Sequence, residues 1–333
     1  MTGSERVLVT GGAGYIGSHV ALALGETGMT AVVLDDLSTG RRACVPAGAV
    51  FVKGNVGDAA LLDTVLREHA ITAVMHFAGS IVVPESVTHP LDYYANNTAN
   101  ALTLLRACVR AGVERFIFSS TAAVYGMPDA LPITEDSPTR PINPYGMSKL
   151  MTEVMLRDAA AAHAMRYVAL RYFNVAGADP TGRSGQSTPT ATHLIKIACQ
   201  AATGQRPGVS VYGDDYPTPD GTCIRDYVHV SDLADAHVAA LRYLASGGES
   251  RVFNCGYGRG YSVREVLNAV QRVTGRSLAV SAAPRRAGDP PALVANAERI
   301  VQELGWVPRR ANLDEIVATA FAWEERLSRQ SPE

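Results

Sequence analysis

The sequence predicts an α/β protein with a doubly wound parallel Rossmann sheet and a smaller, discontinuous C-terminal substrate domain. Two observations in the first half predict the sheet. Short runs rich in β-branched residues alternate with amphipathic stretches, and a glycine-rich turn joins the first such run to the first helical stretch. A third observation predicts the smaller domain: glycine, proline and aspartate become frequent from about residue 175, which indicates loop-rich structure.

The elements follow from the apolar pattern. Strands that are covered on both faces read as near-continuous apolar runs, and such runs occur at 6–10, 31–35, 49–54, 71–79, 114–120 and 166–174. Helices are predicted between them at 15–28, 58–70, 92–112 and 144–163. A regular stretch at 226–244 interrupts the loop-rich region and is expected to rejoin the sheet. We therefore expect a sheet domain of 1–174 plus about 229–260, and a second domain of about 175–228 and 261–333.

Composition excludes several classes of function. The 333 residues carry 30 Lys+Arg and 32 Asp+Glu, a net charge of −2, so neither a nucleic-acid surface nor a polybasic membrane patch is expected. The N-terminus has no apolar signal region, and no apolar run is long enough to span a bilayer. Five scattered cysteines without a CxxC pair predict a reducing, cytoplasmic setting, and the eight histidines show no zinc-binding spacing, so we expect no metal site.

The turn VLVTGGAGYIGSH predicts a dinucleotide site. Gly11, Gly14 and Gly17 fit GxxGxxG, and Gly12 with the latter two fits GxGxxG equally well. Glycines there let the backbone approach a pyrophosphate, whose charge lies at the helix N-terminus. Asp35 ends the second strand, where a carboxylate takes the ribose hydroxyls and repels a 2′-phosphate. The expected cofactor is therefore NAD.

A tyrosine and a lysine on one predicted helix form a candidate catalytic pair. Tyr145 and Lys149 are four residues apart, which places both side chains on one helical face. Only three of the 30 basic residues are lysines, namely Lys53, Lys149 and Lys196, so we ask of each lysine whether it has a function. A tyrosine titrates near pH 10, and acting as a base near neutrality requires about 4 kcal/mol of phenolate stabilisation, which a nearby ammonium and a positive nicotinamide supply. Thr121, at the end of the fifth strand, can hydrogen-bond the same reacting hydroxyl.

These residues and several longer blocks resemble the nucleotide-sugar 4-epimerases of the extended short-chain dehydrogenase/reductase family. The blocks include TGGAGYIGSH, LDDLSTG, FSSTAAVYG, NPYGMSKLMTE and VYGDDYPTPDGTCIRDYVHV, and they extend from residue 9 to about 296. The resemblance implies that UDP-glucose and UDP-galactose are interconverted. Tyr145 would remove the C4 hydroxyl proton, tightly bound NAD would take the hydride, and the transient 4-keto sugar would turn over before reduction.

The resemblance also implies the residues of each subsite. Those implied for NAD are Gly11, Gly14, Tyr15, Ile16, Gly17, Asp35, Asp36, Leu37, Ser38, Thr39, Gly40, Asn55, Val56, Phe77, Ala78, Gly79, Asn96, Thr121, Tyr145, Lys149 and Phe173. Those implied for the UDP-sugar are Thr121, Tyr145, Asn174, His193, Ser210, Val211, Tyr212, Arg225, Arg286, Asp289 and Leu293. The two arginines would hold the diphosphate, a task to which arginine is well suited.

Five positions depart from the family pattern. Asn55 stands where an aspartate commonly faces adenine, and Ile81 replaces a lysine that many members use near the cofactor. His193 lies where some members have an asparagine at the substrate phosphate, and Lys196 follows where proline is common. Leu293 replaces a tyrosine found in some strict glucose/galactose epimerases, so acceptance of UDP-N-acetylglucosamine is open.

Other functions within and outside the family stay open. The nearest alternatives are 4-epimerases of UDP-N-acetylglucosamine, UDP-pentose or UDP-uronic acid, then a dTDP-glucose 4,6-dehydratase, and then a non-catalytic NAD-binding sensor. Mere binding does not need Tyr145, which argues against the sensor. Dehydratases place an Asp-Glu pair after the threonine, where this chain has Ala122 and Ala123. The resemblance further implies a homodimer that pairs the helices around 92–111 and 145–163.

Overall fold

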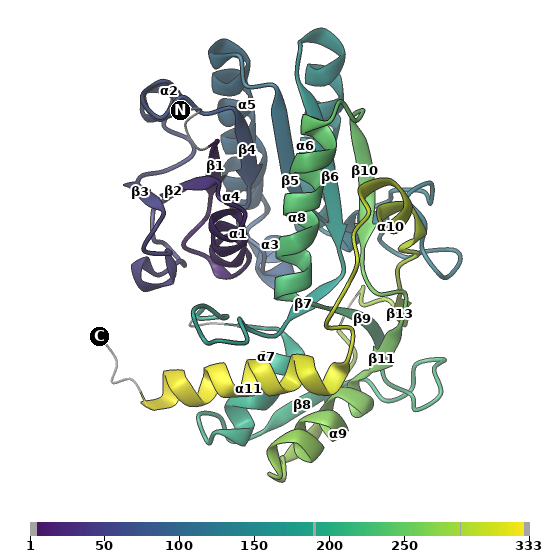
Figure 1. Ribbon diagram of the computed structural model, residues 1–333. Helices are drawn as coiled ribbons and strands as arrows, with labels where there is room; N and C mark the ends of the chain where they lie inside the picture. The colour runs from purple at the N-terminus through teal and green to yellow at the C-terminus, as the bar shows by residue number, and fades with distance from the viewer. Residues whose placement is uncertain (1–4, 189–190, 287, 330–333) are drawn as a thin grey trace.

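A seven-stranded parallel sheet forms the centre of the fold in the computed structural model, which describes residues 5–188, 191–286 and 288–329 (Figure 1). Its order is β10-β6-β5-β4-β1-β2-β3, and all six neighbouring pairs are parallel. The strands are β1 (Arg6–Thr10), β2 (Thr30–Asp35), β3 (Val50–Lys53), β4 (Ala73–His76), β5 (Arg115–Thr121), β6 (Arg166–Tyr172) and β10 (Arg251–Cys255). The order reverses between β1 and β4, where open α/β sheets bind ligands. The predicted fold class is confirmed.

Helices cover both faces of this sheet because successive strand residues point to opposite sides. In β1, Val7 and Val9 enter the core under α1 (Tyr15–Glu26), α8 (Val230–Ala245) and α10 (Glu298–Leu304). Leu8 enters the core under α2 (Ala59–Glu68), α5 (Asn100–Ala111) and α6 (Pro144–Ala162). Two buried cores thus hold the sheet rigid between two helical layers.

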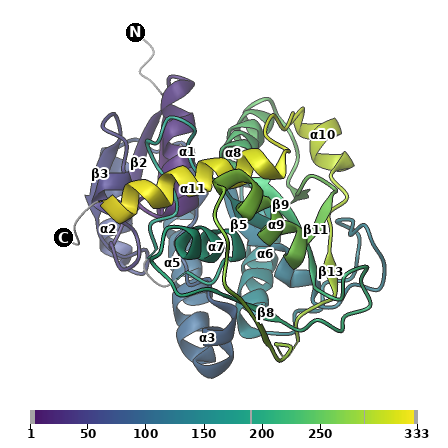
Figure 2. The same ribbon diagram turned by 90° about the horizontal axis from the view of Figure 1, so that it is seen from below.

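Smaller sheets and three helices lie beyond the carboxyl ends of the strands. β9 (Ile224–His229) pairs with β7 (Asn174–Ala176), β11 (Gly260–Ser262) and β13 (Ala292–Leu293), and β12 (Val280–Ala283) pairs with β8 (Val209–Tyr212). A third core joins α7 (Leu194–Ala202), α9 (Val263–Thr274) and α11 (Leu313–Arg329). Figure 2 views the molecule from the side of these helices.

Two predicted elements differ in the structure. The predicted helix at 92–112 is divided into α4 (Pro90–Tyr93), a π-helical segment η2 (Tyr94–Ala99) and α5. The predicted strand at 166–174 ends at Tyr172, and Asn174 begins β7 in the second sheet. The chain therefore crosses from the main sheet to the smaller one beside a predicted site residue.

Three short helices complete the described elements: α3 (Val83–Thr88), η1 (Arg42–Cys44) and η3 (Ala122–Tyr125). The stretch at 226–244 forms the end of β9 and most of α8, and α8 packs on α1 of the main layer. α10 packs there too, through Ile300. The predicted domain division, which assigns 261–333 to the second domain, stays a prediction. Across the described ranges, no helix is long and apolar enough to cross a membrane.

Candidate active site

The glycine turn between β1 and α1 has no room for side chains. Gly11 has φ +70°, and a Cβ there would lie 2.6 Å from the Ala78 nitrogen. A Cβ on Gly17 would lie 2.3 Å from the Gly11 oxygen. Gly14 caps α1 without a side chain, so the first-turn N–H groups of the helix face the turn. This cradle fits the pyrophosphate of a dinucleotide.

Asp35 organises the loop next to that turn. Its carboxylate accepts hydrogen bonds from Ala13 N at 2.9 Å and from Leu37 N at 2.8 Å. Burial raises the pKa of this carboxyl, and the two backbone bonds oppose the rise. Leu37 has φ 63°, a conformation that costs a non-glycine residue about 1–3 kcal/mol and is concentrated at functional sites. The loop 35–40 is thus held in shape beside the glycine turn, as a ribose site requires.

The loop after β4 is fixed by the π-helical segment. Asn97 Oδ1 accepts from Ser80 N at 2.7 Å, and Asn96 Nδ2 donates to Ser80 Oγ at 2.9 Å. A Cβ on Gly79 would lie 2.8 Å from Asn97 Oδ1, so the loop backbone lies directly against this amide. Two consecutive asparagines of the π-helical segment thus hold one loop, and such segments are frequent at functional sites.

The N-terminus of α6 is placed against the end of β5. Asn143 caps the helix by accepting from Gly146 N at 2.8 Å, and Pro144 takes the first helical position. A Cβ on Gly146 would lie 2.6 Å from the Ala123 oxygen, so the two backbones are in close contact. The structure therefore brings Tyr145 to Thr121, whose hydroxyl hydrogen-bonds the phenol. The Asn-Pro cap and the glycine are sequence signals that our prediction of this helix did not use.

Lys149 lies buried behind Tyr145. Its Nζ donates to Ser119 O at 3.0 Å and lies 5.0 Å from the centroid of the Phe118 ring. Burial lowers the pKa of Lys149 to about 8, and burial followed by the charge of Lys149 lowers the pKa of His76 to about 3. His76 is thus a neutral structural residue, and its Nδ1 is 2.7 Å from Thr10 Oγ1.

The electrostatics of Tyr145 differ from the simple expectation. In the protein alone, burial raises the pKa of the phenol, and the Thr121 hydrogen bond opposes that rise. Our prediction took Lys149 and the positive nicotinamide of NAD as the groups that lower the pKa of Tyr145, and it did not include desolvation, which favours the neutral phenol.

A buried ion pair behind the cluster was missed. Glu153 follows Lys149 by one helical turn, and its carboxylate accepts from Arg171 Nε at 3.0 Å and Nη2 at 2.6 Å. Ser120 Oγ donates to the same carboxylate at 2.5 Å. Both charged side chains are buried. The pair fastens α6 to β5 and β6 next to Thr121, and the i, i+4, i+8 spacing from Tyr145 was its available signal.

The smaller sheets carry several of the predicted substrate residues: Asn174 on β7, Arg225 on β9, Leu293 on β13, and Ser210, Val211 and Tyr212 on β8. Arg225 Nη2 donates to Asp289 Oδ1 at 2.5 Å, and Leu293 pairs with Arg225 in the β9–β13 register. The Arg286 guanidinium lies 3.9 Å from the centroid of the Tyr212 ring. Leu293 also packs against the apolar cluster that contains Ala122 and Phe173, which links β13 to the segment that follows Thr121.

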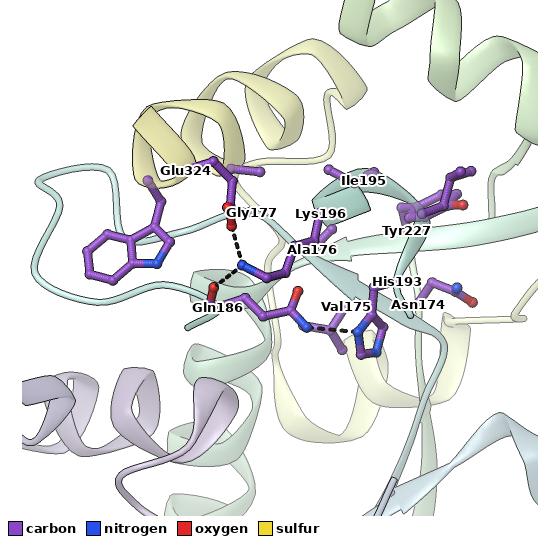
Figure 3. Close-up of a pocket in the computed structure, with 13 residues that line it drawn as sticks. Asn174, Val175, Ala176, Gly177, Gln186, His193, Ile195, Lys196, Tyr227 and Glu324 are labelled. Carbon is purple, nitrogen blue, oxygen red and sulfur yellow. Dashed lines mark hydrogen bonds and ion pairs between the residues drawn. The ribbon is translucent and has the colours of Figure 1, made fainter. Parts of the chain in front are cut away.

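Asn174 and His193 line a cavity at the start of α7 (Figure 3). His193 directly precedes the helix, and its Nδ1 lies 2.8 Å from Gln186 Nε2. Burial, and then the charge of Lys196, lower the pKa of His193, so the ring is neutral. The loop holding Gln186 reaches α1 through a 2.7 Å contact of Ser184 Oγ with Ser18 Oγ.

The structure also describes the side chains of other residues that the resemblance singles out, whose roles stay predictions. Val56 is buried in a core, Val211 is buried in another, and Ser210 is exposed beside Ser281. Asn55 Nδ2 donates to Asp36 and its Oδ1 accepts from Gly57 N, so both ends of that amide are engaged within the protein. Ile81 is exposed.

Nothing in the described part of the chain resembles a metal centre: no group of three or more His, Cys, Asp or Glu side chains is arranged to hold an ion.

Comparison with known proteins agrees with this geometry. Residues 7–256 match the NAD-dependent epimerase/dehydratase family. The chain belongs to this family. The UDP-glucose 4-epimerase of Azospirillum brasilense is 65% identical over 324 residues, which cover 97% of this chain and 93% of that protein.

Solved structures of relatives have the same fold. A UDP-glucose 4-epimerase superposes with a TM-score of 0.96 at 46% identity, covering 99% of this chain and 100% of that one. The UDP-glucose 4-epimerase of Brucella ovis, in complex with NAD, gives 0.93 at 48% identity, covering 96% of this chain and 98% of that one. The family match to 7–256 includes the glycine turn and the candidate catalytic residues, whereas Arg286, Asp289 and Leu293 lie beyond it.

Proposed function

We propose that this protein is an NAD-dependent UDP-glucose 4-epimerase, which interconverts UDP-glucose and UDP-galactose through a transient 4-keto sugar. The observation that carries this proposal is the cluster of Thr121, Tyr145 and Lys149 at the end of β5, next to the glycine turn. The 65% identity to the Azospirillum brasilense enzyme supports it. The relatives that carry this name span nearly the whole chain.

Tyr145 is the proton carrier. Its Oη takes the proton of the sugar C4 hydroxyl as C4 is oxidised, and it gives the proton back as the ketone is reduced from the opposite face. Thr121 hydrogen-bonds the phenol and shares the reacting hydroxyl. Lys149, with Nζ fixed by Ser119 O at 3.0 Å, adds the positive charge that favours the phenolate.

The cradle at the N-terminus of α1, the Asp35 loop and the segment 77–79 hold the cofactor. When bound, NAD supplies a hydride acceptor and a positive charge beside the phenol. Burial raises the pKa of Tyr145, so charges must lower it before the phenol can act as a base near neutrality. Lys149 is the protein's own contribution to that charge.

The substrate is held by its nucleotide diphosphate. The guanidinium groups of Arg225 and Arg286 supply forked hydrogen-bond donors to the diphosphate. Asn174 and His193 supply uncharged hydrogen-bond donors. Asp289 and Tyr212 border the uridine. Anchoring the diphosphate leaves the sugar free to turn, which C4 inversion requires. Ala122 and Ala123 contribute neither acid nor base for elimination, which disfavours dehydration.

The sugar preference depends on the pocket at Leu293. This side chain is half-buried against the cluster that contains Ala122 and Phe173. A leucine is smaller than tyrosine, so UDP-N-acetylglucosamine is a second candidate substrate.

A homodimer is supported by an exposed apolar face on the helices that the resemblance implies. Leu91, Leu102, Met151 and Val154 lie on or beside α4, α5 and α6 and are 78%, 38%, 41% and 39% exposed. A second copy of the chain would cover them. Sedimentation of Met151→Glu as a monomer would support this dimer, and an unchanged dimer would contradict it.

We place the reaction in cytoplasmic galactose metabolism. The five cysteines are free and buried, as a reducing compartment allows.

A coupled assay tests the function. Purified protein is incubated with UDP-galactose without added NAD and is then removed, and UDP-glucose is measured in a second step with a UDP-glucose dehydrogenase and its own NAD. Formation of UDP-glucose supports the proposal. If no hexose, N-acetylhexosamine or pentose nucleotide undergoes C4 inversion, the proposal fails.

A further inference from the structure

Lys196 is a buried lysine outside the catalytic cluster. Of the three lysines, Lys53 is exposed, Lys149 lies behind Tyr145, and Lys196 lies on α7 with 4% of its surface exposed. Its Nζ forms an ion pair with Glu324 of α11, which is equally buried. The two residues are 128 positions apart.

The position of Lys196 is electrostatically unfavourable. It is the third residue of α7, where the N-terminal end of the helix carries partial positive charge and disfavours a cation. Burying an ion pair also costs desolvation that its attraction repays only with good geometry. A hydrophobic residue would satisfy packing alone, so the lysine calls for another explanation.

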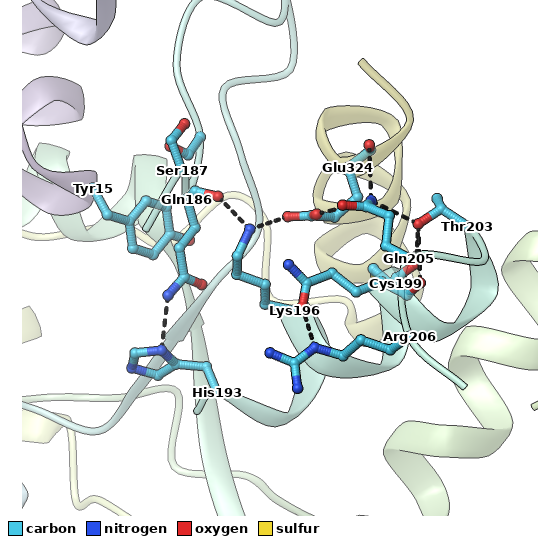
Figure 4. Close-up of polar contacts among 12 residues, drawn as sticks. Tyr15, Gln186, Ser187, His193, Lys196, Cys199, Thr203, Gln205, Arg206 and Glu324 are labelled. Atoms are coloured by element: carbon cyan, nitrogen blue, oxygen red, sulfur yellow. Dashed lines mark hydrogen bonds and ion pairs between the residues drawn. The ribbon is translucent and has the colours of Figure 1, made fainter. Parts of the chain in front are cut away.

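Polar contacts connect Lys196 through Gln186 to His193, which lines the cavity beside Asn174 (Figure 4). Nζ donates to the main-chain oxygen of Gln186 at 2.7 Å. The side chain of the same glutamine lies 2.8 Å from His193 Nδ1. The Glu324 carboxylate also accepts a hydrogen bond from Gln205 Nε2 at 3.4 Å, so it has a second partner. A continuous set of polar contacts therefore joins α11 to His193.

These contacts fix the form of the His193 ring. An amide nitrogen that donates to Nδ1 leaves the proton on Nε2, which makes Nε2–H a donor. The nearby charge of Lys196 adds to burial in lowering the pKa of His193, so the ring stays neutral. A neutral N–H donor can do the work of the asparagine amide found elsewhere in the family.

We propose that Lys196 and Glu324 are positioning residues, which act through Gln186 to orient His193 as a hydrogen-bond donor to the diphosphate of the UDP-sugar. This inference rests on the proposed function. C-terminal helix α11 is thereby part of the substrate-binding apparatus, although it contributes no predicted site residue.

The test separates positioning from stability. Lys196→Met, Gln186→Leu and the double variant Lys196→Met/Glu324→Gln are compared with wild type, and Lys53→Met is the matched exposed control. The holoenzymes are assayed for KM and kcat with UDP-galactose, for affinity for UDP by calorimetry, and for Tm. Gln186→Leu leaves the ion pair and its main-chain contact intact, so it tests the His193 contact without removing a buried charge.

We expect Lys196→Met and Gln186→Leu to raise KM and the Kd for UDP about tenfold, with kcat changed less than about threefold, as loss of one hydrogen bond to a charged group predicts. The double variant should regain the Tm of wild type while its KM stays raised. Recovery of both Tm and KM in the double variant, or an unchanged Kd for UDP in Lys196→Met, would overturn the inference. Failure of wild type to invert any nucleotide sugar would refute the proposed function, and the Kd values for UDP would still decide the role of Lys196.

Discussion

Replacing Lys149 with methionine should stop turnover and, at the same time, stabilise the folded protein. Lys149 is buried, and its Nζ has a hydrogen bond to Ser119 O and the face of Phe118, with no carboxylate among these contacts. Methionine has a similar length and no charge to desolvate. The side chain thus carries a stability cost that the catalytic role proposed for it explains.

The magnitude follows from the pKa of the ammonium. Burial lowers this pKa from 10.5 to about 8, a difference worth about 3 kcal/mol at 1.36 kcal/mol per pKa unit. Because the folded pKa lies below the unfolded one, the cost is complete below pH 8 and disappears as pH rises toward 10.5. The stabilisation by Lys149→Met should therefore be about 3 kcal/mol at pH 7 and about 1 kcal/mol at pH 10. At neutral pH this corresponds to a rise in Tm of about 4 °C for 333 residues.

Urea denaturation of nucleotide-free protein at pH 7 and pH 10 measures both values. Lys53→Met, which changes an exposed lysine, is the control and should leave stability within about 0.5 kcal/mol. A Lys149→Met protein that is less stable than wild type at pH 7 would refute the reasoning. So would a stabilisation that does not shrink between the two pH values.

Three further predictions concern the neighbouring residues. Tyr145→Phe should lower kcat about 1,000-fold in the coupled assay with KM nearly unchanged, because it removes the proton carrier; retention of a tenth of wild-type kcat would exclude that role. Glu153→Gln should lower the free energy of unfolding by about 3–5 kcal/mol in urea, because it leaves Arg171 buried without its charge partner. Combining Glu153→Met with Arg171→Met should recover most of this loss, and equal losses would argue against the ion pair as the cause. Leu293→Tyr should lower kcat/KM for UDP-N-acetylgalactosamine at least about tenfold more than for UDP-galactose, and equal losses would exclude Leu293 as the selective contact.

The main sheet could be predicted because its information is local. Runs such as RVLVT are apolar on both faces, and the glycine turn marks the join to α1, so strand and helix each follow from a short window. The Tyr145–Lys149 face was predictable for the same reason, since the helical period fixes the relation of residues four apart. Thr121 could be predicted as a third member of this group because it lies at the end of β5.

Features that depend on distant partners were not predictable. The spacing from Tyr145 places Glu153 on the same helical face but does not identify its partner Arg171 on β6. Lys196 pairs with Glu324 at a separation of 128 residues, so no local pattern identifies the partner in either pair. The π-helical segment was also not predicted, because a π-helix differs from an α-helix in its backbone hydrogen bonds, which the apolar pattern does not reveal. The direction of the pKa change at Tyr145 depends on burial, which the spacing of Tyr145 and Lys149 does not reveal.

The central claim is that the site oxidises and re-reduces one sugar carbon and changes nothing else. The most direct test is the NMR spectrum of UDP-galactose after incubation with the enzyme in D₂O. The account predicts UDP-glucose with hydrogen retained at C4 and with no deuterium on any ring carbon, because the hydrogen removed from C4 is the one returned. Deuterium at C5 with loss of the C6 hydroxyl, or the absence of any UDP-glucose, would contradict it.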